Sequence, residues 1–436
     1  MKYRFRDLPR MLATPGGRLQ VRDGIAYNLY PLLSRLAHAW RRTVVRRTRV
    51  VAVVGSFGKS TTLRAVSAAL GVAIHPRALY NAFTSLASAV LRVRPGQARA
   101  VIEAGIAAPG EMERYARMIR PDLVVVTTIG SEGSPRLGSL DDIRDQKSRM
   151  VRALPASGTA VLNADDPRVA WMAGVTAAQV VRYGFGDDCD VRGSDLRLDW
   201  PRGSRLRVDA FGQSCEFAVR LVGRHMMVPV LAAIAVAIRE GVPLAEAARR
   251  LAALEPTPGR MQPVELPGGV TMLCDDFKST IETLHAALDV FAEVPATRRI
   301  VVFGDVTEPP AERAPVYAAL GERIAAIADH LVVFGPSLAD YATGARRAGM
   351  NAGAIHDGGL TPQQTVVVLR ELLRPGDAIL LKGRRGQKLD RVRLLLAGAP
   401  VGCDVALCDL QVACTDCPMR ERGWHGRPRV LERDLH

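Results

Sequence analysis

The 436-residue sequence is poor in aromatic residues and has no long apolar run. Aromatic residues make up 5% of the chain and hydrophobic residues 48%, which argues against an aromatic-rich β-sandwich and favours α/β layers of alanine and valine. Because no stretch of about eighteen consecutive apolar residues occurs, we expect no membrane-spanning helix. The N-terminal stretch MKYRFRDLPRM lacks the apolar core of a signal peptide, so we expect a cytoplasmic protein.

Lysine is scarce as well, and arginine supplies nearly all of the 59 basic residues. A chain that uses arginine almost everywhere reflects a coding bias. Each lysine that remains is therefore a candidate for chemistry that a guanidinium group cannot perform. The lysines are Lys2, Lys59, Lys147, Lys278, Lys382 and Lys388.

The net charge of +15 is spread unevenly, because residues 1–50 alone carry +10 of it. Residues 1–48 are predicted to form a basic, amphipathic N-terminal arm. Its apolar residues recur at helical spacing, namely Leu29, Leu32, Leu33, Leu36, Trp40 and Val44. This pattern fits a basic helix packed on the next domain, and equally a helix lying on an anionic membrane surface. Nucleic-acid binding is less favoured, because only Trp40 interleaves with the arginines.

Residues 49–257 alternate strand-like and helical segments, which predicts an α/β domain with a mainly parallel sheet. The buried strands are expected within 99–105, 122–130 and 158–166. The polar, alternating segment from Cys189 to Gly223 indicates antiparallel strands attached to that sheet. A helix is expected after it, over 226–241.

A linker rich in proline, residues 254–264, precedes a second α/β domain that we place at 258–400. Four short apolar runs, each followed by Asp or Gly, are expected to form a doubly wound, Rossmann-like sheet. They lie at 270–276, 298–305, 329–335 and 377–383. Ligands of such a sheet bind at the carboxyl ends of its strands.

The segment VVAVVGSFGKSTTLRAVSAAL, residues 50–70, predicts a strand, a phosphate-binding loop and a helix. Its chemistry-bearing residues are Gly55, Gly58, Lys59, Ser60 and Thr61. The lysine would reach the β- and γ-phosphates of a nucleotide, and one hydroxyl would hold magnesium. The usual loop has another glycine five residues before Gly58, where this chain has Val53, so the loop is shorter than the standard one. A glycine turn with an ordinary surface lysine is the alternative.

A shortened loop of this kind resembles that of the Mur ligase family, and the resemblance extends over residues 49–395. The segments AVIEAGIAAPGEMERYARMIRPDLVVVTTIGSEG, KSRMVRALPASGTAVLNADDP, PGRMQPV, DDFKSTIETLHAALDVF and LLKGRRGQKLDRV are similar, in order, to the branch that adds D-alanyl-D-alanine. The resemblance implies an ATP- and magnesium-dependent ligase that forms an amide from a small-molecule or peptidyl carboxylate and an amine, through an acyl phosphate. The family's N-terminal domain for uridine diphosphate does not fit into 48 residues, so a donor other than a UDP-muramyl peptide is expected.

Several residues of the first domain match family motifs. Lys59 and Ser60 match the phosphate-binding lysine and the metal-binding hydroxyl, and Glu103 matches a magnesium ligand at a strand end. Lys147 matches a lysine that family members carbamylate to make a metal ligand, although a surface lysine on a helix is the alternative. Asn81 matches an asparagine near the substrate.

Further matches imply roles in nucleotide and amine binding. Arg260 matches a hinge arginine that reaches the γ-phosphate when the domains close, and His225 matches the start of an adenine-side motif. Asp276, Lys278 and Lys382 stand at strand ends that would face ATP and the amine. The resemblance thus assigns catalytic roles to Lys59, Lys147, Arg260 and Lys382.

The chain also departs from the family pattern. A histidine expected after the third strand is absent from Ile129–Gly133, where Glu132 is the candidate substitute. Two amides of the adenine motif are replaced in His225–Pro229, and Phe277–Thr280 replaces the branch's Tyr-x-x-Asn-Pro. These changes leave open the amine substrate, and they leave a nucleotide-binding scaffold without turnover as the alternative function.

Four of the seven cysteines lie in a C-terminal tail, residues 401–436. They are Cys403, Cys408, Cys414 and Cys417. A structural zinc ion or an iron–sulfur cluster is one interpretation of this group, and a redox-active or free-thiol tail is the other. The scattered Cys189, Cys215 and Cys274 are expected to be reduced thiols.

Overall fold

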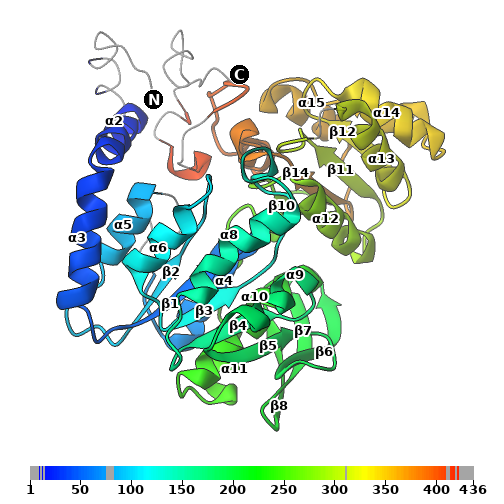
Figure 1. The fold of residues 1–436 in the computed structure, drawn as a ribbon. Helices are drawn as coiled ribbons and strands as arrows, with labels where there is room; N and C mark the ends of the chain where they lie inside the picture. Colours follow the sequence, from blue (N-terminus) through cyan, green and yellow to red (C-terminus); the bar gives the residue numbers. More distant parts are fainter. Residues whose placement is uncertain are drawn as a thin grey trace. The chain divides into compact units, whose positions relative to one another are not determined.

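The computed structural model describes residues 9, 12, 15–74, 83–309, 312–408, 413–417 and 420–421. The chain forms two compact units. One comprises Ile25–Glu255, and the other comprises Met1–Gly24 together with Pro256–His436. Each unit is built on its own β-sheet (Figure 1).

The sheet of the Ile25–Glu255 unit has eight strands in the order β2-β1-β3-β4-β5-β6-β7-β8. Pairing is parallel from β2 to β6 and antiparallel from β6 to β8. The strands are β1 (Arg49–Val54), β2 (Arg99–Glu103), β3 (Leu123–Val126), β4 (Thr159–Asn163), β5 (Gln179–Gly184), β6 (Val191–Asp199), β7 (Gly203–Ala210) and β8 (Gln213–Val219). The predicted parallel sheet and its antiparallel extension are both confirmed.

The helices of this unit follow the strands in alternation. They are α3 (Tyr30–Thr43), α4 (Lys59–Leu70), α5 (Phe83–Leu91), α6 (Glu111–Ile119), α7 (Ser134–Leu137), α8 (Leu140–Arg152), α9 (Pro167–Ala170), the 3-10 turn η3 (Trp171–Val175), α10 (Arg224–Arg239) and α11 (Leu244–Ala252). The helix α2 (Pro15–Asn28) precedes them. Valines of β1 and β3 are buried on both faces of the sheet, as expected for a parallel sheet covered by helices.

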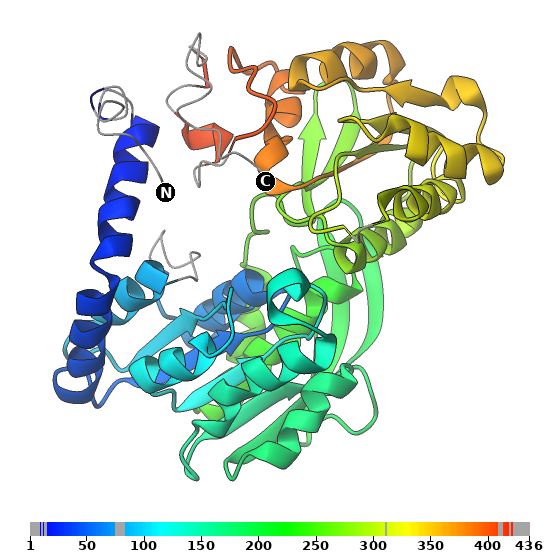
Figure 2. The same cartoon turned by 45° about the horizontal axis from the view of Figure 1, so that its top comes forward.

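Helix α3 packs against α5 and α6 of the same unit (Figures 1 and 2). Arg41 is buried, and its Nε donates to the carbonyl of Ile119 at 2.8 Å. Its Nη2 reaches Asp122 at 3.1 Å, and the Trp40 Nε1 donates to the carbonyl of Val93 at 3.0 Å. The predicted basic helix is therefore fixed to the adjacent domain along one face.

The sheet of the other unit has six strands in the order β13-β12-β11-β14-β10-β9, all parallel except the edge strand β9. The strands are β9 (Gln262–Leu266), β10 (Val270–Asp275), β11 (Arg299–Phe303), β12 (His330–Val333), β13 (Ile355–Asp357) and β14 (Ala378–Lys382). The predicted Rossmann-like sheet is confirmed, but its two edge strands were not predicted. Strand β9 overlaps the end of the predicted linker and contains Pro263, which an edge position tolerates.

The helices of this unit are α12 (Ile281–Glu293), α13 (Arg313–Ala325), α14 (Leu338–Arg347), α15 (Pro362–Leu372) and α16 (Asp390–Leu396), with 3-10 turns η4 (Ala352–Ala354), η5 (Arg385–Gln387) and η6 (Cys414–Asp416). Helices α13 and α14 lie side by side (Figure 1). Glycines permit this approach, since a Cβ atom at Gly344 would lie 1.7 Å from the carbonyl oxygen of Ala318.

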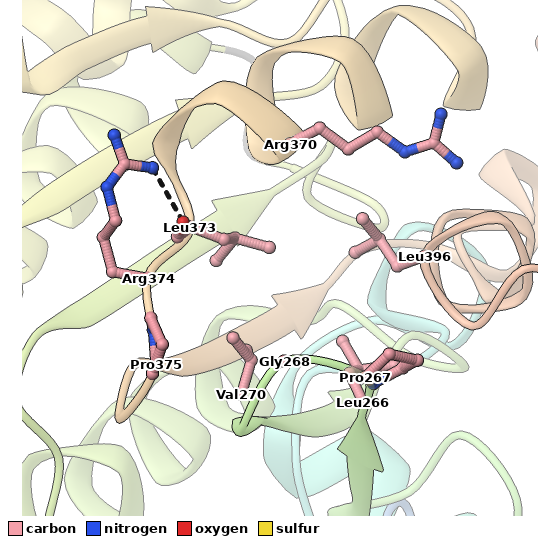
Figure 3. Close-up of a pocket in the computed structure, with 9 residues that line it drawn as sticks. All are labelled: Leu266, Pro267, Gly268, Val270, Arg370, Leu373, Arg374, Pro375 and Leu396. Atoms are coloured by element: carbon pink, nitrogen blue, oxygen red, sulfur yellow. Dashed lines mark hydrogen bonds between the residues drawn. The ribbon is translucent and has the colours of Figure 1, made fainter.

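A pocket of about 280 Å³ lies at the amino ends of β10 and β14 (Figure 3). Figure 3 shows the Arg374 side chain turned to the carbonyl of Leu373, to which its Nη1 donates at 2.8 Å. The other lining residues are Leu266, Pro267, Gly268, Val270, Arg370, Pro375 and Leu396. The pocket is thus at the opposite end of these strands from Asp275 and Lys382.

Within the part of the chain described above, none of the helices combines the length and the hydrophobicity needed to span a bilayer.

Candidate active site

The loop between β1 and α4 has the geometry of an anion-binding site. Gly58 precedes the first turn of α4 with φ of +78°, and no side chain caps the helix there. Gly55 has φ of +144°, and a Cβ atom on it would lie 1.9 Å from the Thr127 Oγ1. Only glycine fits this position, and the uncapped helix start directs backbone N–H groups toward a bound anion.

The residues that follow β3 hold this loop in place. The Ser56 N–H donates to the carbonyl of Thr128 at 2.7 Å, and the Phe57 N–H donates to the Thr128 Oγ1 at 3.1 Å. The Ser56 Oγ donates to the carbonyl of Gly130 at 3.0 Å and accepts from its N–H at 2.9 Å. The sequence analysis did not identify these supports. The feature of the sequence that could have indicated these contacts is the pair Thr127 and Thr128, which are polar and directly follow the apolar strand β3.

Two buried lysine side chains converge on this loop. The Lys59 Nζ donates to the carbonyls of Gly55 and Ser56, each at 2.8 Å, and lies 3.4 Å from the Glu132 Oε2. The Lys147 Nζ, from α8, donates to the same Gly55 carbonyl at 2.7 Å. Their exposed fractions are 6% and 3%, so neither is the surface lysine that we considered as an alternative. Two ammonium groups bring positive charge to one loop, and the Glu132 carboxylate offsets part of it.

Oxygen ligands suited to magnesium lie beside the same loop. Glu103 is the last residue of β2, is 2% exposed, and pairs in register with Val53 of β1. Ser60 and Thr61 are buried in the first turn of α4. A carboxylate and a hydroxyl are the hard oxygen donors that magnesium prefers, and magnesium completes its shell with water and phosphate oxygens. The residues present therefore fit the ion that the family resemblance implies.

The predicted nucleotide residue His225 is half-buried in the first turn of α10. Pro229, one turn further, approaches the loop, because its Cγ would lie 4.0 Å from a Cβ atom on Gly58. The start of α10 is thus close to the phosphate-binding loop. Asn81, the predicted substrate residue, lies outside the described residues.

In the other unit, the carboxyl ends of β10 and β14 bring Asp275 and Lys382 together in register. The Lys382 Nζ forms an ion pair with the Asp275 Oδ2 and donates to the carbonyl of Lys278 at 2.7 Å. Burial lowers the pKa of Lys382, and the neighbouring Asp275 opposes this shift. Asp276 was predicted from the sequence as a site residue, whereas Asp275, the preceding residue at the same strand end, was not.

Asp276 is buried near two other carboxylates, those of Asp275 and Asp390. Burial raises its pKa to about 7, and the charges of Asp390 and Asp275 act in the same direction. Gly259 lies against this carboxyl, because a Cβ atom on it would be 2.8 Å from the Asp276 Oδ1. Asp276 is therefore a proton-binding group near neutral pH.

The raised pKa of Asp276 should make folding stability depend on pH. The native pKa of about 7 exceeds the ordinary value of 3.8, so the native state holds a proton that the unfolded chain releases between these pH values. This stabilisation is complete below about pH 4 and is lost as the pH rises through about 7. We expect Asp276→Asn to flatten the fall in the free energy of unfolding over this window, measured by urea denaturation. An unchanged slope would contradict the assignment.

The ring of Phe277 makes cation–π contacts with two guanidinium groups. Arg260 lies 4.3 Å from the ring centroid and Arg385 lies 4.6 Å from it. Lys278, the residue after Phe277, is half-buried, and its carbonyl accepts a hydrogen bond from the Lys382 Nζ. Where the family's tyrosine is replaced, this chain therefore has an aromatic ring that orients Arg260.

The cysteine tail does not form the predicted metal site. No three His, Cys, Asp or Glu side chains are grouped to hold a metal ion anywhere in the residues that the structure describes. Cys403 and Cys408 instead pack in a small apolar cluster with Val405, and Cys417 lies against it. Burial raises the pKa of the Cys414 thiol, which disfavours a reactive thiolate. The structure thus gives no support to zinc or an iron–sulfur cluster.

These features define a class of protein, a phosphate-binding α/β domain followed by a Rossmann-like domain, and family comparisons agree. The Mur ligase middle domain matches residues 53–237, and the glutamate ligase domain of Mur ligases matches residues 259–385. The chain therefore belongs to the Mur ligase family and is an ATP-dependent ligase that forms amide bonds. The predicted family and enzyme class are confirmed.

Similar proteins include members of the branch whose motifs this chain resembles. The chain is 29% identical over 401 residues to the UDP-N-acetylmuramoyl-tripeptide–D-alanyl-D-alanine ligase of Mycobacterium bovis, covering 85% of this chain and 77% of that one. MurF from Acinetobacter baumannii has the same fold, with a TM-score of 0.75 at 21% identity over 85% of this chain and 80% of that one. MurF from Thermotoga maritima, solved in complex with ADP, gives a TM-score of 0.72 at 20% identity, with coverages of 85% and 83%.

Proposed function

We propose that this ligase couples a peptidyl carboxylate to an amino acid or a short peptide amine, with the β1–α4 loop as its ATP site. The observation that carries the proposal is the convergence of Lys59 and Lys147 on the Gly55 carbonyl, next to the buried Glu103. A site with two buried cations and an uncapped helix start attracts a polyphosphate. This explains why lysine is kept here in a chain that otherwise uses arginine.

The reaction has two steps. A carboxylate oxygen attacks the γ-phosphorus, the bond to the bridging oxygen breaks, and ADP leaves with the electron pair. The amine nitrogen then attacks the carbonyl carbon of the acyl phosphate, the bond to the phosphate oxygen breaks, and the amine loses a proton. The chain must hold both reactants in line and stabilise charge that develops on phosphate oxygens.

We assign the first step to the loop residues. Gly55 and Gly58 let the backbone approach the phosphates, Lys59 stabilises charge on the transferred group, and Thr61 supports the first turn of α4. Magnesium, held by Ser60 and Glu103, would neutralise further phosphate oxygens. Unmodified, Lys147 adds positive charge at the same loop. Its carbamylation, which would replace that charge with a negative one and supply a metal ligand, stays a prediction.

We assign the second domain to the phosphate and the amine. Lys382 is held by Asp275 at a strand end, where ligands of doubly wound sheets bind. Arg260 is oriented by Phe277 and supplies a planar cation suited to phosphate oxygens. Asp276 and Lys278 are the remaining candidates for contacts to the amine, and His225 is the candidate for the nucleotide base.

We predicted a donor other than a UDP-muramyl peptide, but the structure and the comparisons lend this no support. The Mycobacterium bovis relative is by name a ligase of UDP-N-acetylmuramoyl-tripeptide and D-alanyl-D-alanine. That pair is therefore the first to test, followed by peptides with a free carboxylate and no nucleotide.

The test measures release of ADP and phosphate together with the mass of the product. We expect ATP consumption that requires both a carboxylate and an amine, with one amide formed per ATP and a product lighter by one water than the two substrates. Without the amine, acyl phosphate formation should stop after about one turnover. Nucleotide binding with no turnover on any pair would instead support the scaffold alternative and contradict the proposal.

A further inference from the structure

Four large apolar side chains project from the N-terminal helical segment of the Ile25–Glu255 unit. Ile25, Leu29, Leu32 and Leu36 have exposed fractions of 55%, 47%, 54% and 49%. Their spacings of four, three and four residues place them on one face of a helix. We call this set the leucine stripe. Large apolar residues that are exposed in a row mark an interaction surface more often than isolated ones do.

The stripe cannot turn inward, because the opposite face of α3 is fixed. Ala37 and Arg41 on that face are buried. The Arg41 guanidinium donates to the carbonyls of Ile119 and Arg120 at 2.8 and 2.9 Å. Backbone hydrogen bonds continue through the junction before α3, from the Leu29 N–H to the Ile25 carbonyl at 3.0 Å. The stripe is therefore presented outward on a rigid support.

Exposed arginines accompany the stripe. Arg35 and Arg42 are seven residues apart and lie on one side of it, while Arg46 and Arg47 follow the end of the helix. No acidic residue occurs in α3, and residues 1–50 carry a net charge of +10. An apolar face with basic flanks is typical of helices that lie in the interface of an anionic bilayer.

We propose that the helical face that carries the leucine stripe, from Ile25 at the end of α2 to Leu36 in α3, docks on a membrane surface that contains anionic lipids. The leucine stripe enters the boundary between headgroups and acyl chains, and the arginines bind lipid phosphates. Charge favours this partner over a second copy of the chain. Antiparallel or parallel pairing of two stripes would bring the arginines of two copies together, and α3 contains no acid to compensate. The proposal is independent of the ligase reaction.

The experiment is flotation of the full-length protein with vesicles, comparing phosphatidylcholine alone with phosphatidylcholine mixed with phosphatidylglycerol. We expect binding to the anionic vesicles that weakens as salt is raised. The double variant Leu32→Asp and Leu36→Asp should have an affinity for the anionic vesicles that is lower by a factor of roughly ten or more. A matched control, Leu360→Asp with Val367→Asp, changes two exposed apolar residues of the other unit, at 56% and 59% exposure, and should bind like the wild type.

Three results would overturn the proposal. The first is equal binding of the stripe variant and the wild type to the anionic vesicles. The second is equal binding of the wild type to neutral and anionic vesicles. The third is a doubled mass of the wild type by light scattering, lost in the stripe variant, without vesicle binding, because the stripe would then pair two copies. Since all the substituted residues are exposed, thermal melting should show that both double variants fold.

Discussion

Replacing Lys59 with alanine should lower the rate of ATP-dependent amide formation by about 10²–10³-fold, the usual cost of losing one preorganised group that stabilises transition-state charge. The Lys59 ammonium group is held by the carbonyls of Gly55 and Ser56, so it is positioned before ATP binds. Lys147 donates to the same Gly55 carbonyl from α8. We do not expect Lys147 to take over the role of Lys59, because its side chain approaches the loop from a different helix. The loss should appear in kcat more than in KM, since charge on the phosphate develops in the transition state.

Two companions sharpen this test. Lys59→Arg should restore little activity, because a buried site shaped for a compact ammonium group does not accept a planar guanidinium. Arg152→Ala removes an exposed cation of the same unit, at the end of α8, and should leave kcat unchanged. Near-UV circular dichroism distinguishes a folded, inactive Lys59→Ala from an unfolded one. A folded variant with wild-type kcat would remove Lys59 from the mechanism.

The loop and its lysine were predictable because they depend on local sequence. An apolar run ending in two glycines and a lysine at the start of a helix has few structural meanings. The order of motifs along the chain then identified the family and the two sheets. The metal-binding roles of Glu103 and Lys147 came from the resemblance, and their burial beside or against the loop is a finding of the structure.

Features that depend on contacts distant in sequence were not predictable. The threonines after β3 support the loop only because β3 pairs with β1, a fact set by sheet order. Glu132 was named as a substitute for a missing histidine, and its approach to Lys59 at 3.4 Å required the folded chain. The spacing of the C-terminal cysteines matched no specific metal-binding motif. In the folded chain Cys403, Cys408 and Cys417 pack in an apolar cluster, and the described residues show no grouping that would hold a metal ion.

The short edge strands were missed for a different reason. Strand β13 has three residues, Ile355–Asp357, too few to show an alternating pattern. Strand β9 contains a proline and begins inside the proline-rich segment predicted as a linker, so composition argued against a strand there. In each case the neighbouring strand supplies the hydrogen bonds that define the edge strand, and the local sequence shows no preference for a β-strand.

The second large effect is expected at the Lys382–Asp275 ion pair. Lys382→Met should lower the free energy of unfolding by about 3–5 kcal/mol, because it leaves the buried Asp275 carboxylate without its cation. The double variant Asp275→Asn with Lys382→Met removes that unpaired charge. It should therefore recover much of the lost stability while kcat for amide formation stays low. Recovered stability with a low kcat is the result expected if Lys382 takes part in the reaction as well as stabilising the fold.

A matched ion pair controls for the structural effect. Arg298 and Asp377 form a pair at the opposite end of the same sheet, with 2.6 Å between the Nη2 and Oδ2 atoms. Arg298→Met also leaves a buried carboxylate without its cation, because the Asp377 side chain is fully buried. The Arg298 side chain is 28% exposed, so this substitution should lower the free energy of unfolding by less than Lys382→Met does. Measured at a temperature where it is folded, this variant should keep wild-type kcat. If it loses as much activity as the double variant, the effect of Lys382 is one of stability, and its catalytic assignment fails.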